Sequence, residues 1–158
     1  MPKFIPEGYH SITPYLIVRN ASEAIEFYKK AFGATVIYQL DIPGGKIGHA
    51  ELKIGNSLFM LADEHPDMGY FSPQSLKGTP VNFMLFVEDV DAFATEAIKQ
   101  GLKMKKPIED RFYGDRNGSF QDPYGHEWTI STRKEKVSVE EIKKRAQKLF
   151  SGEGSGGH

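Results

Sequence analysis

Two stretches of the chain follow one plan: TPYLIVRN at residues 13–20 and NFMLFVED at residues 82–89. In each, an apolar run typical of a β-strand ends at a valine, and a residue that commonly caps helix N-termini follows two positions later. These capping residues, Asn20 and Asp89, are 69 positions apart (89 − 20 = 69), and so are the two valines. An offset shared by strand and helix indicates an internal repeat. We therefore expect two modules built on one half-fold, which share a core and a cleft.

The residues after each cap predict an amphipathic helix followed by strands. In the first module, apolar residues fall on one face of a helix that Gly33 ends: Ala21, Ala24, Ile25, Tyr28 and Phe32. A similar helix follows Asp89 and ends at Gly101. The strand-like segments are 35–42, 46–54 and 57–62 in the first module, and 103–108, 110–113, 119–121 and 127–132 in the second. Short turns separate them, and one of these turns is expected at 114–118.

The order of these elements, βαβββ and again βαβββ, predicts an α+β fold in which both modules belong to one structural domain. The predicted divisions are a first module at 10–64, a linker at 65–79, a second module at 80–134, a C-terminal helix at 138–150 and a disordered tail at 151–158. A linker of this length is expected to be a flap or to pack across the mouth of a cleft. The tail is rich in glycine, which disfavours order.

Composition narrows the classes of function. The chain has 158 residues, which is enough for a hydrophobic core that needs no disulfide or metal to stabilise it. Its lack of cysteine excludes disulfides and thiolate metal sites. The net charge is −1 and lysine and arginine are spread along the chain, so the sequence predicts no basic surface for binding nucleic acid. No apolar run is long enough to span a bilayer, and the first residues lack the apolar segment of a signal peptide. We expect a cytoplasmic protein without a nucleic-acid or membrane partner.

Several motifs, spread over about residues 10 to 145, carry a family resemblance. They are TPYL (13–16), AIEFYKKAFGA (24–34), GHAELKIG (48–55), MLADE (60–64), VEDVDA (87–92), FYGDR (112–116) and DPYGHEW (122–128). On these motifs the chain resembles the PhnB-like branch of the vicinal-oxygen-chelate superfamily, which includes glyoxalase I, extradiol dioxygenases, and bleomycin and fosfomycin resistance proteins. The resemblance implies a cupped mixed sheet, helices outside it, a ligand cleft in the concavity and a homodimer.

The resemblance also implies where a divalent metal would lie, because enzymes of the superfamily hold one through four side chains on the first and last strands of each module. The corresponding positions are Thr13, Phe59, Asn82 and Thr129. Divalent cations in proteins prefer imidazole, thiolate, carboxylate or several oxygen ligands. A phenyl ring offers none of these, and threonine hydroxyls are weak neutral ligands. We therefore expect no metal cofactor at these positions.

Alternation along the strands predicts a largely apolar and aromatic pocket with a few hydroxyls and amides, which suits a small-molecule ligand. The predicted ligand-binding residues are Thr13, Tyr15, Phe59, Asn82, Met84, Phe112, Tyr113, Arg116 and Thr129. The same side chains could instead pack against one another as hydrophobic core and leave no open pocket. Arg116 could bind an anionic group of the ligand through two hydrogen bonds, or it could form an ion pair with a carboxylate within its own hairpin. Trp128 is expected to pack under a helix.

The favoured function is a small-molecule-binding protein that needs no metal and takes an aromatic or amphipathic ligand in the cleft between the modules. The alternative is a metal-dependent lyase, isomerase or dioxygenase-like enzyme with a displaced site for Zn, Ni, Mn or Fe at His49 and Glu51. These two side chains lie on one strand face, so they could ligate one ion or form a hydrogen-bonded pair that locks the sheet. A metal-free enzyme using Asp115 or Glu127 as acid or base also stays open, and no catalytic residue is assigned.

Overall fold

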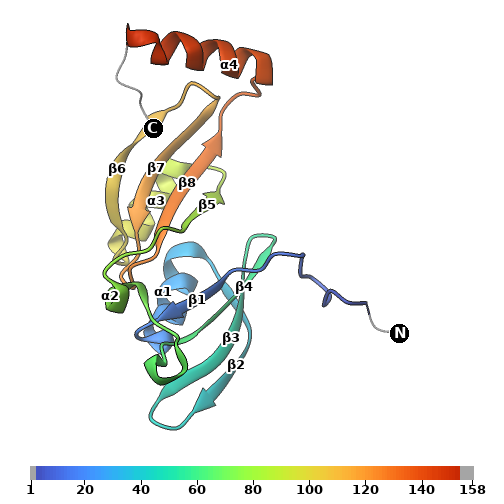
Figure 1. The fold of residues 1–158 in the computed structure, drawn as a ribbon, viewed down its shortest axis with the longest axis vertical. Coiled ribbons are helices and arrows are strands. Elements are labelled where there is room, and N and C mark those ends of the chain that lie inside the picture. The colour runs from blue at the N-terminus through green and yellow to red at the C-terminus, as the bar shows by residue number, and fades with distance from the viewer. Residues whose placement is uncertain (1–2, 154–158) are drawn as a thin grey trace.

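Each module forms one four-stranded sheet in the computed structural model, which describes residues 3–153 (Figure 1). The first module contains β1 (Tyr15–Val18), α1 (Ala21–Phe32), β2 (Thr35–Ile42), β3 (Lys46–Ile54) and β4 (Ser57–Asp63). The second contains β5 (Asn82–Phe86), α3 (Val90–Lys99), β6 (Lys103–Asp110), β7 (Asp115–Gln121) and β8 (Glu127–Arg133). The strand orders, β1-β4-β3-β2 and β5-β8-β7-β6, are equivalent, so the predicted α+β fold of tandem βαβββ modules is confirmed.

The repeat extends to the register of the strands. β1 pairs parallel to β4 with Tyr15 opposite Met60, and β5 pairs parallel to β8 with Met84 opposite Thr129. Both strands repeat at the offset found in the sequence, since 84 − 15 = 69 and 129 − 60 = 69. One face of each sheet packs against helices in the hydrophobic core, and we call the opposite face its open face.

The helices of the two modules begin at equivalent contacts that come from the neighbouring strands. Asn20 is the N-cap residue of α1, as predicted, but its side chain makes no capping bond. Instead Asp63, at the end of β4, accepts a bond from the Ala21 amide at 2.9 Å. In the second module the Thr132 hydroxyl accepts a bond from the Val90 amide at 2.9 Å, again 69 positions later (132 − 63 = 69). A tertiary contact thus stabilises the start of each helix.

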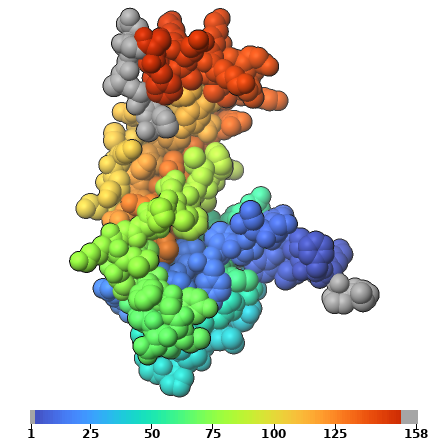
Figure 2. Space-filling view, viewed as in Figure 1, coloured from blue at the N-terminus to red at the C-terminus, as the bar shows by residue number. Residues whose placement is uncertain are grey.

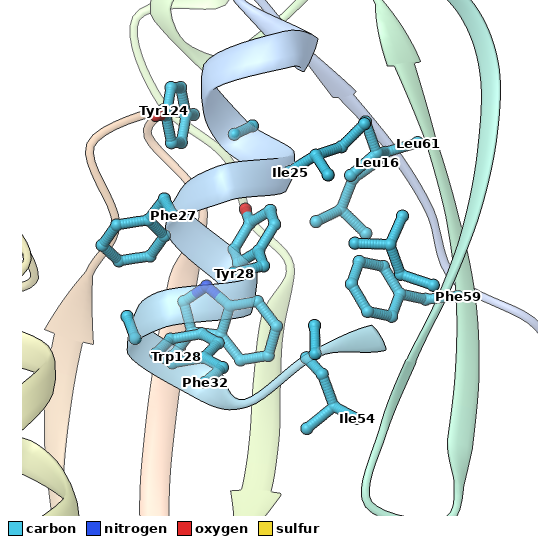
Figure 3. Close-up of a cluster of buried hydrophobic side chains, with 14 of the residues drawn as sticks. Leu16, Ile25, Phe27, Tyr28, Phe32, Ile54, Phe59, Leu61, Tyr124 and Trp128 are labelled. Carbon is cyan, nitrogen blue, oxygen red and sulfur yellow. The ribbon is translucent and has the colours of Figure 1, made fainter. Parts of the chain in front are cut away.

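Aromatic side chains of α1 fill the core between the two modules. Figure 3 shows α1 between the strands that carry Phe59 and those that carry Trp128. The Tyr28 ring lies 5.8 Å from that of Phe59 and 6.0 Å from that of Trp128, and Phe32 lies 4.8 Å from Trp128. The helix-facing sides of both sheets therefore share one core, and the open faces lie on its outside. This arrangement overturns the expectation of one cleft enclosed by both open faces within a single chain.

The linker contains η1 (Pro66–Met68) and α2 (Pro73–Leu76) and packs against the first module (Figure 2). Glu64 anchors it, because its carboxylate accepts bonds from Ser72 N at 2.9 Å and Ser75 Oγ at 2.7 Å, and Arg19 Nε lies 3.3 Å away. Burial by itself would raise the pKa of this carboxyl, but these hydrogen bonds outweigh it and lower the pKa to about 2.

Replacing Glu64 with glutamine should therefore destabilise the protein in a pH-dependent way. Because the pKa of Glu64 is lower in the folded than in the unfolded chain, its contribution is complete above pH 4.5 and disappears as the pH falls through about 2. The unfolding free energies of the wild type and Glu64→Gln should differ by about 1–3 kcal/mol at pH 7 and converge near pH 2 in urea titrations. A difference independent of pH would contradict this role.

The turn between β6 and β7 departs from the sequence prediction. It falls at 111–114, where Gly114 has a φ of 100° and its amide bonds to Arg111 O at 3.1 Å, and not at 114–118. Gly118 lies inside β7, where a Cβ atom would come within 3.0 Å of the Lys106 carbonyl oxygen. This second glycine therefore allows the close approach of two strands and does not form a turn.

The C-terminal helix α4 (Val139–Lys148) continues as a π-helical segment, η2 (Leu149–Glu153). Ser138 caps α4, because its hydroxyl accepts a bond from the Glu141 amide at 3.2 Å. The prediction of a disordered tail is wrong for residues 151–153, which belong to η2, and residues 154–158 lie outside the described residues. No helix in the described part of the chain is long and apolar enough to cross a membrane.

Candidate functional site

The open face of the first sheet carries the side chains that the candidate site uses. On β1, Leu16 and Val18 are buried against the helix, whereas Tyr15 is 47% exposed on the open face, as alternation predicts. On β4, Phe59 is buried toward α1 and Met60 lies opposite Tyr15. The expectation that Phe59 faces the concave side is therefore wrong, because counting from the turn glycine missed the true register by one residue.

A phenol, an imidazole and a carboxylate form a hydrogen-bonded chain across this open face. Tyr15 Oη lies 2.8 Å from His49 Nδ1, and His49 Nε2 lies 2.9 Å from Glu51 Oε2. Tyr38, on β2, donates to Glu51 Oε2 at 3.0 Å, and Tyr9, before β1, donates to Glu51 Oε1. Since β3 places His49 and Glu51 on one side of the strand, the predicted His–Glu pair is present, but three tyrosines complete it.

Burial and hydrogen bonding fix the charge of these groups. Burial would raise the pKa of Glu51, but hydrogen bonds from His49, Tyr9 and Tyr38 outweigh it, so the pKa is lowered. The pKa of Tyr15 is raised, chiefly by burial and then by Tyr70 and Glu51. Near neutral pH, Glu51 is therefore a carboxylate and Tyr15 is a neutral phenol.

A hollow of about 530 Å³ opens beside Tyr15. We call it the first-sheet hollow. Its lining includes Ile17 on β1, Ala62 on β4, Ile42 at the end of β2, and Met68 and Tyr70 from the linker. Mixed apolar and phenolic lining next to a few polar groups is typical of small-molecule sites. The linker therefore packs beside a hollow on the first sheet alone, and the site needs no cleft between the two modules of one chain.

The other predicted binding residues fall into separate places. Thr13, Phe59 and Met84 line a smaller hollow of about 230 Å³, which we call the seam hollow, between the first module and Trp128 of the second. Trp128 is buried, as predicted. Asn82 and Thr129 bond to each other on the second sheet, with Asn82 Nδ2 at 2.8 Å from Thr129 Oγ1. The predicted set therefore does not converge on one hollow.

The polar and aromatic residues around the β6–β7 turn lie elsewhere. Arg116 pairs with Asp110 of its own hairpin at 3.2 Å, as one of the two interpretations predicts, and its shorter ion pair, with Asp91 at 2.8 Å, joins the hairpin to α3. Tyr113 accepts a bond from Asn117 Nδ2 at 3.0 Å. Phe112, Tyr113 and Arg116 are absent from the lining of the first-sheet hollow.

Asp115 and Glu127, the candidate acid or base groups of a metal-free enzyme, also lie on the second module. Asp115 is buried on β7, where its carboxylate accepts a bond from Arg133 at 3.1 Å. Glu127 begins β8 and pairs with Asn82 in the register of the second sheet. Neither residue lines the first-sheet hollow, so neither is placed to act on a ligand bound beside Tyr15.

Duplicated βαβββ sheets, each with an open face, define a two-module fold class. The chain belongs to the Glyoxalase/Bleomycin resistance protein/Dioxygenase superfamily, whose family model matches residues 8–130. The uncharacterized Mycobacterium bovis protein Mb0911c is 38% identical over 149 residues, which cover 92% of this chain and 95% of that protein.

Two solved structures show the same fold. The PhnB protein from Bacillus cereus is 20% identical with a TM-score of 0.60, over 78% of this chain and 99% of that one. The fosfomycin resistance protein FosX from Listeria monocytogenes, solved with Mn(II) and sulfate, is 20% identical with a TM-score of 0.61, over 86% and 96%.

The residues at the superfamily's metal positions do not fit a divalent cation. The register replaces Phe59 by Met60, so the four side chains are Thr13, Met60, Asn82 and Thr129, which offer no imidazole or carboxylate. At the displaced position, both nitrogens of His49 already have hydrogen-bond partners. Within residues 3–153 no three His, Cys, Asp or Glu side chains group closely enough to hold an ion.

Proposed function

We propose that the protein binds a small molecule with an aromatic or other apolar body in the first-sheet hollow, without a metal, in the cytoplasm. The observation that carries this proposal is the hollow itself, where Ile17, Ala62 and Met68 offer apolar contact beside the Tyr15 side chain, whose hydroxyl lies 2.8 Å from His49 Nδ1. Such a combination stabilises a ligand by burial of apolar surface and orients it by one polar contact. The lack of cysteine supports the cytoplasmic location.

We further propose that a second copy of the chain covers the open faces. Both faces expose large apolar side chains: Tyr15 and Leu40 on the first sheet are 47% and 54% exposed, and Met84 and Phe86 on the second are 48% and 60% exposed. Large apolar side chains that are exposed on a sheet face favour an interaction site there. The occupant is a second copy, because the repeat gives one chain two open faces of the same construction, and a homodimer can pair them.

Replacing Phe86 with aspartate should convert the protein from a dimer to a monomer, because the new carboxylate would have to be buried unpaired at the interface. Sedimentation velocity at micromolar concentration measures the change. Ile98→Asp is the control, since Ile98 is similarly exposed, at 41%, but lies on α3. A wild type that sediments as a monomer would exclude this assembly.

Ligand binding should be blocked by filling the first-sheet hollow. The probe is 2-naphthol, whose fused rings suit a hollow of this size. Ile17→Trp, which places a large ring in the lining, should weaken binding by at least about tenfold, or ~1.4 kcal/mol, in isothermal titration calorimetry. Thr13→Trp, which fills the seam hollow instead, is the matched control and should leave the affinity unchanged. The opposite pattern would move the site to the seam hollow.

Catalysis is the second candidate function, and the Tyr15–His49–Glu51 chain favours it. A reactive hydroxyl, a base and an orienting carboxylate in hydrogen-bond contact are the parts that proton transfer requires. A metal-dependent lyase, isomerase or dioxygenase-like reaction at His49 and Glu51 has a separate test. A stoichiometric divalent ion that co-purifies with the protein and is lost in His49→Ala would support it.

A further inference from the structure

We infer that the ligand of the first-sheet hollow carries a hydrogen-bond donor, such as a phenolic hydroxyl or an amine, which bonds to Tyr15 Oη. This inference rests on the proposed function and adds the chemical class of the ligand. It follows from which atom donates and which accepts in each hydrogen bond that links Glu51, His49 and Tyr15.

Glu51 fixes the first proton. Its carboxylate can only accept hydrogen bonds, and it lies against the Tyr9 hydroxyl, the Tyr38 hydroxyl and His49 Nε2. Two acceptors cannot bond to each other, so His49 Nε2 carries a hydrogen and donates it to Glu51. In the neutral imidazole that we propose for His49, the other nitrogen, Nδ1, then has a free lone pair.

His49 in turn fixes the proton of Tyr15. A bare Nδ1 at 2.8 Å from the phenol can only accept, so the Tyr15 hydroxyl donates its one proton to His49. The described residues provide no other hydrogen-bond partner for Tyr15 Oη, and the side chain is 47% exposed beside the hollow. To a ligand that reaches it from the hollow, the oxygen therefore offers lone pairs alone, and the Glu51 carboxylate at the far end of the hydrogen-bonded chain increases their negative character.

Three charged side chains that line the hollow, Asp63, Glu64 and Lys46, do not reverse this preference. The Asp63 carboxylate accepts from the backbone amides of Ala21 and Ile47 at 2.9 and 2.7 Å, and Glu64 is occupied by the linker. Lys46 is exposed on the β2–β3 hairpin, so an anionic ligand group would face Lys46 and not Tyr15. Donor ligands and anionic ligands thus make different contacts, and a binding experiment separates them.

The experiment compares three probes of one shape: 2-naphthol, 2-methoxynaphthalene and 2-naphthoate, titrated by calorimetry at neutral pH. The naphthol should bind about tenfold more tightly than its methyl ether, because the ether cannot donate to Tyr15 Oη. Tyr15→Phe should bring the ratio of the two affinities close to one. Tyr124→Phe is the matched control, because Tyr124 is buried at the contact with Phe27 of α1, away from the hollow, and should keep the wild-type ratio.

His49→Leu tests the proton order itself. Without the imidazole acceptor, the Tyr15 hydroxyl is free to donate into the hollow, so the ether should gain affinity and the ratio should fall while Tyr15 remains present. A ratio that is unchanged in either Tyr15→Phe or His49→Leu would overturn the inference. Equal binding of naphthol and ether to the wild type would also overturn it and leave the proposed function standing.

Two further outcomes of the titrations would count against the inference in different ways. Tightest binding of the naphthoate, lost in Lys46→Ala, would overturn the inference in favour of an anion held by the hairpin. Absence of binding by all three probes to the folded wild type would count against the proposed function as well as the inference.

Discussion

Replacing Asp122 with alanine should lower the free energy of unfolding by about 3–5 kcal/mol, which for a chain of this size corresponds to a fall in Tm of about 10 °C. Asp122 is only 3% exposed and accepts bonds from Tyr28 Oη at 2.5 Å and Trp128 Nε1 at 2.9 Å. The amides of Tyr124 and His126 donate to its other oxygen at 2.9 and 3.0 Å. Alanine would leave these donors in the core between the modules without an acceptor.

Urea denaturation with a matched pair of variants measures this effect. Asp122→Asn keeps the volume but turns an amide group toward donors, so it should also be destabilising, to a smaller extent. Asp67→Ala removes an exposed carboxylate in η1 and should change the unfolding free energy by less than about 0.5 kcal/mol. Equal stabilities of Asp122→Ala and Asp67→Ala would show that the buried carboxylate does not join the modules.

Replacing Gly114 with alanine should cost about 2–4 kcal/mol of unfolding free energy, from strained backbone and from overpacking. Gly114 has a φ of +100°, and a Cβ atom there would lie 2.5 Å from the Glu135 carbonyl oxygen and 2.8 Å from Val137 Cγ2. The carbonyl of Gly114 also accepts the amides of Lys134 and Glu135 at 2.8 and 3.1 Å, so the chain leading to α4 cannot move away without losing these bonds.

Gly44→Ala is the control that separates the two causes. Gly44 has a similar φ of +88°, but nothing lies within 4 Å of the added Cβ atom. Alanine at Gly44 should therefore show the backbone strain alone, about 1 kcal/mol, and the excess at Gly114 measures the contact with residues 135–137. If Gly114→Ala and Gly44→Ala lose the same unfolding free energy in thermal or urea denaturation, residues 135–137 must move to make room for the added Cβ atom.

The repeat was accessible from the sequence because it depends on local patterns. Strand and helix periodicity, with one offset of 69, predicted both modules and the order of their elements. Tyr15 was placed on the correct face by simple alternation along β1. Phe59 was not, because its face depends on the register between β4 and β1, which the turn glycine does not fix.

Tyr38 shows why part of the site could not be predicted. Ile42 pairs with Lys46 at the end of the β2–β3 hairpin, so counting back along both strands would place Tyr38 opposite Ala50. The register shifts between Leu40 and Asp41, and this irregularity brings Tyr38 opposite Glu51 instead. Tyr9 and Tyr70 reach the same open face from the arm and the linker, whose paths leave no periodic signal in the sequence.

The sequence by itself determined the duplicated half-fold and the proximity of His49 and Glu51 on one strand face. These follow from residue identity and from spacing within single elements. Only the tertiary structure decided which faces of the sheets meet, because α1 inserts its rings between the modules and turns both open faces outward. It likewise decided that a tyrosine completes the His–Glu pair, since that contact joins residues 34 positions apart.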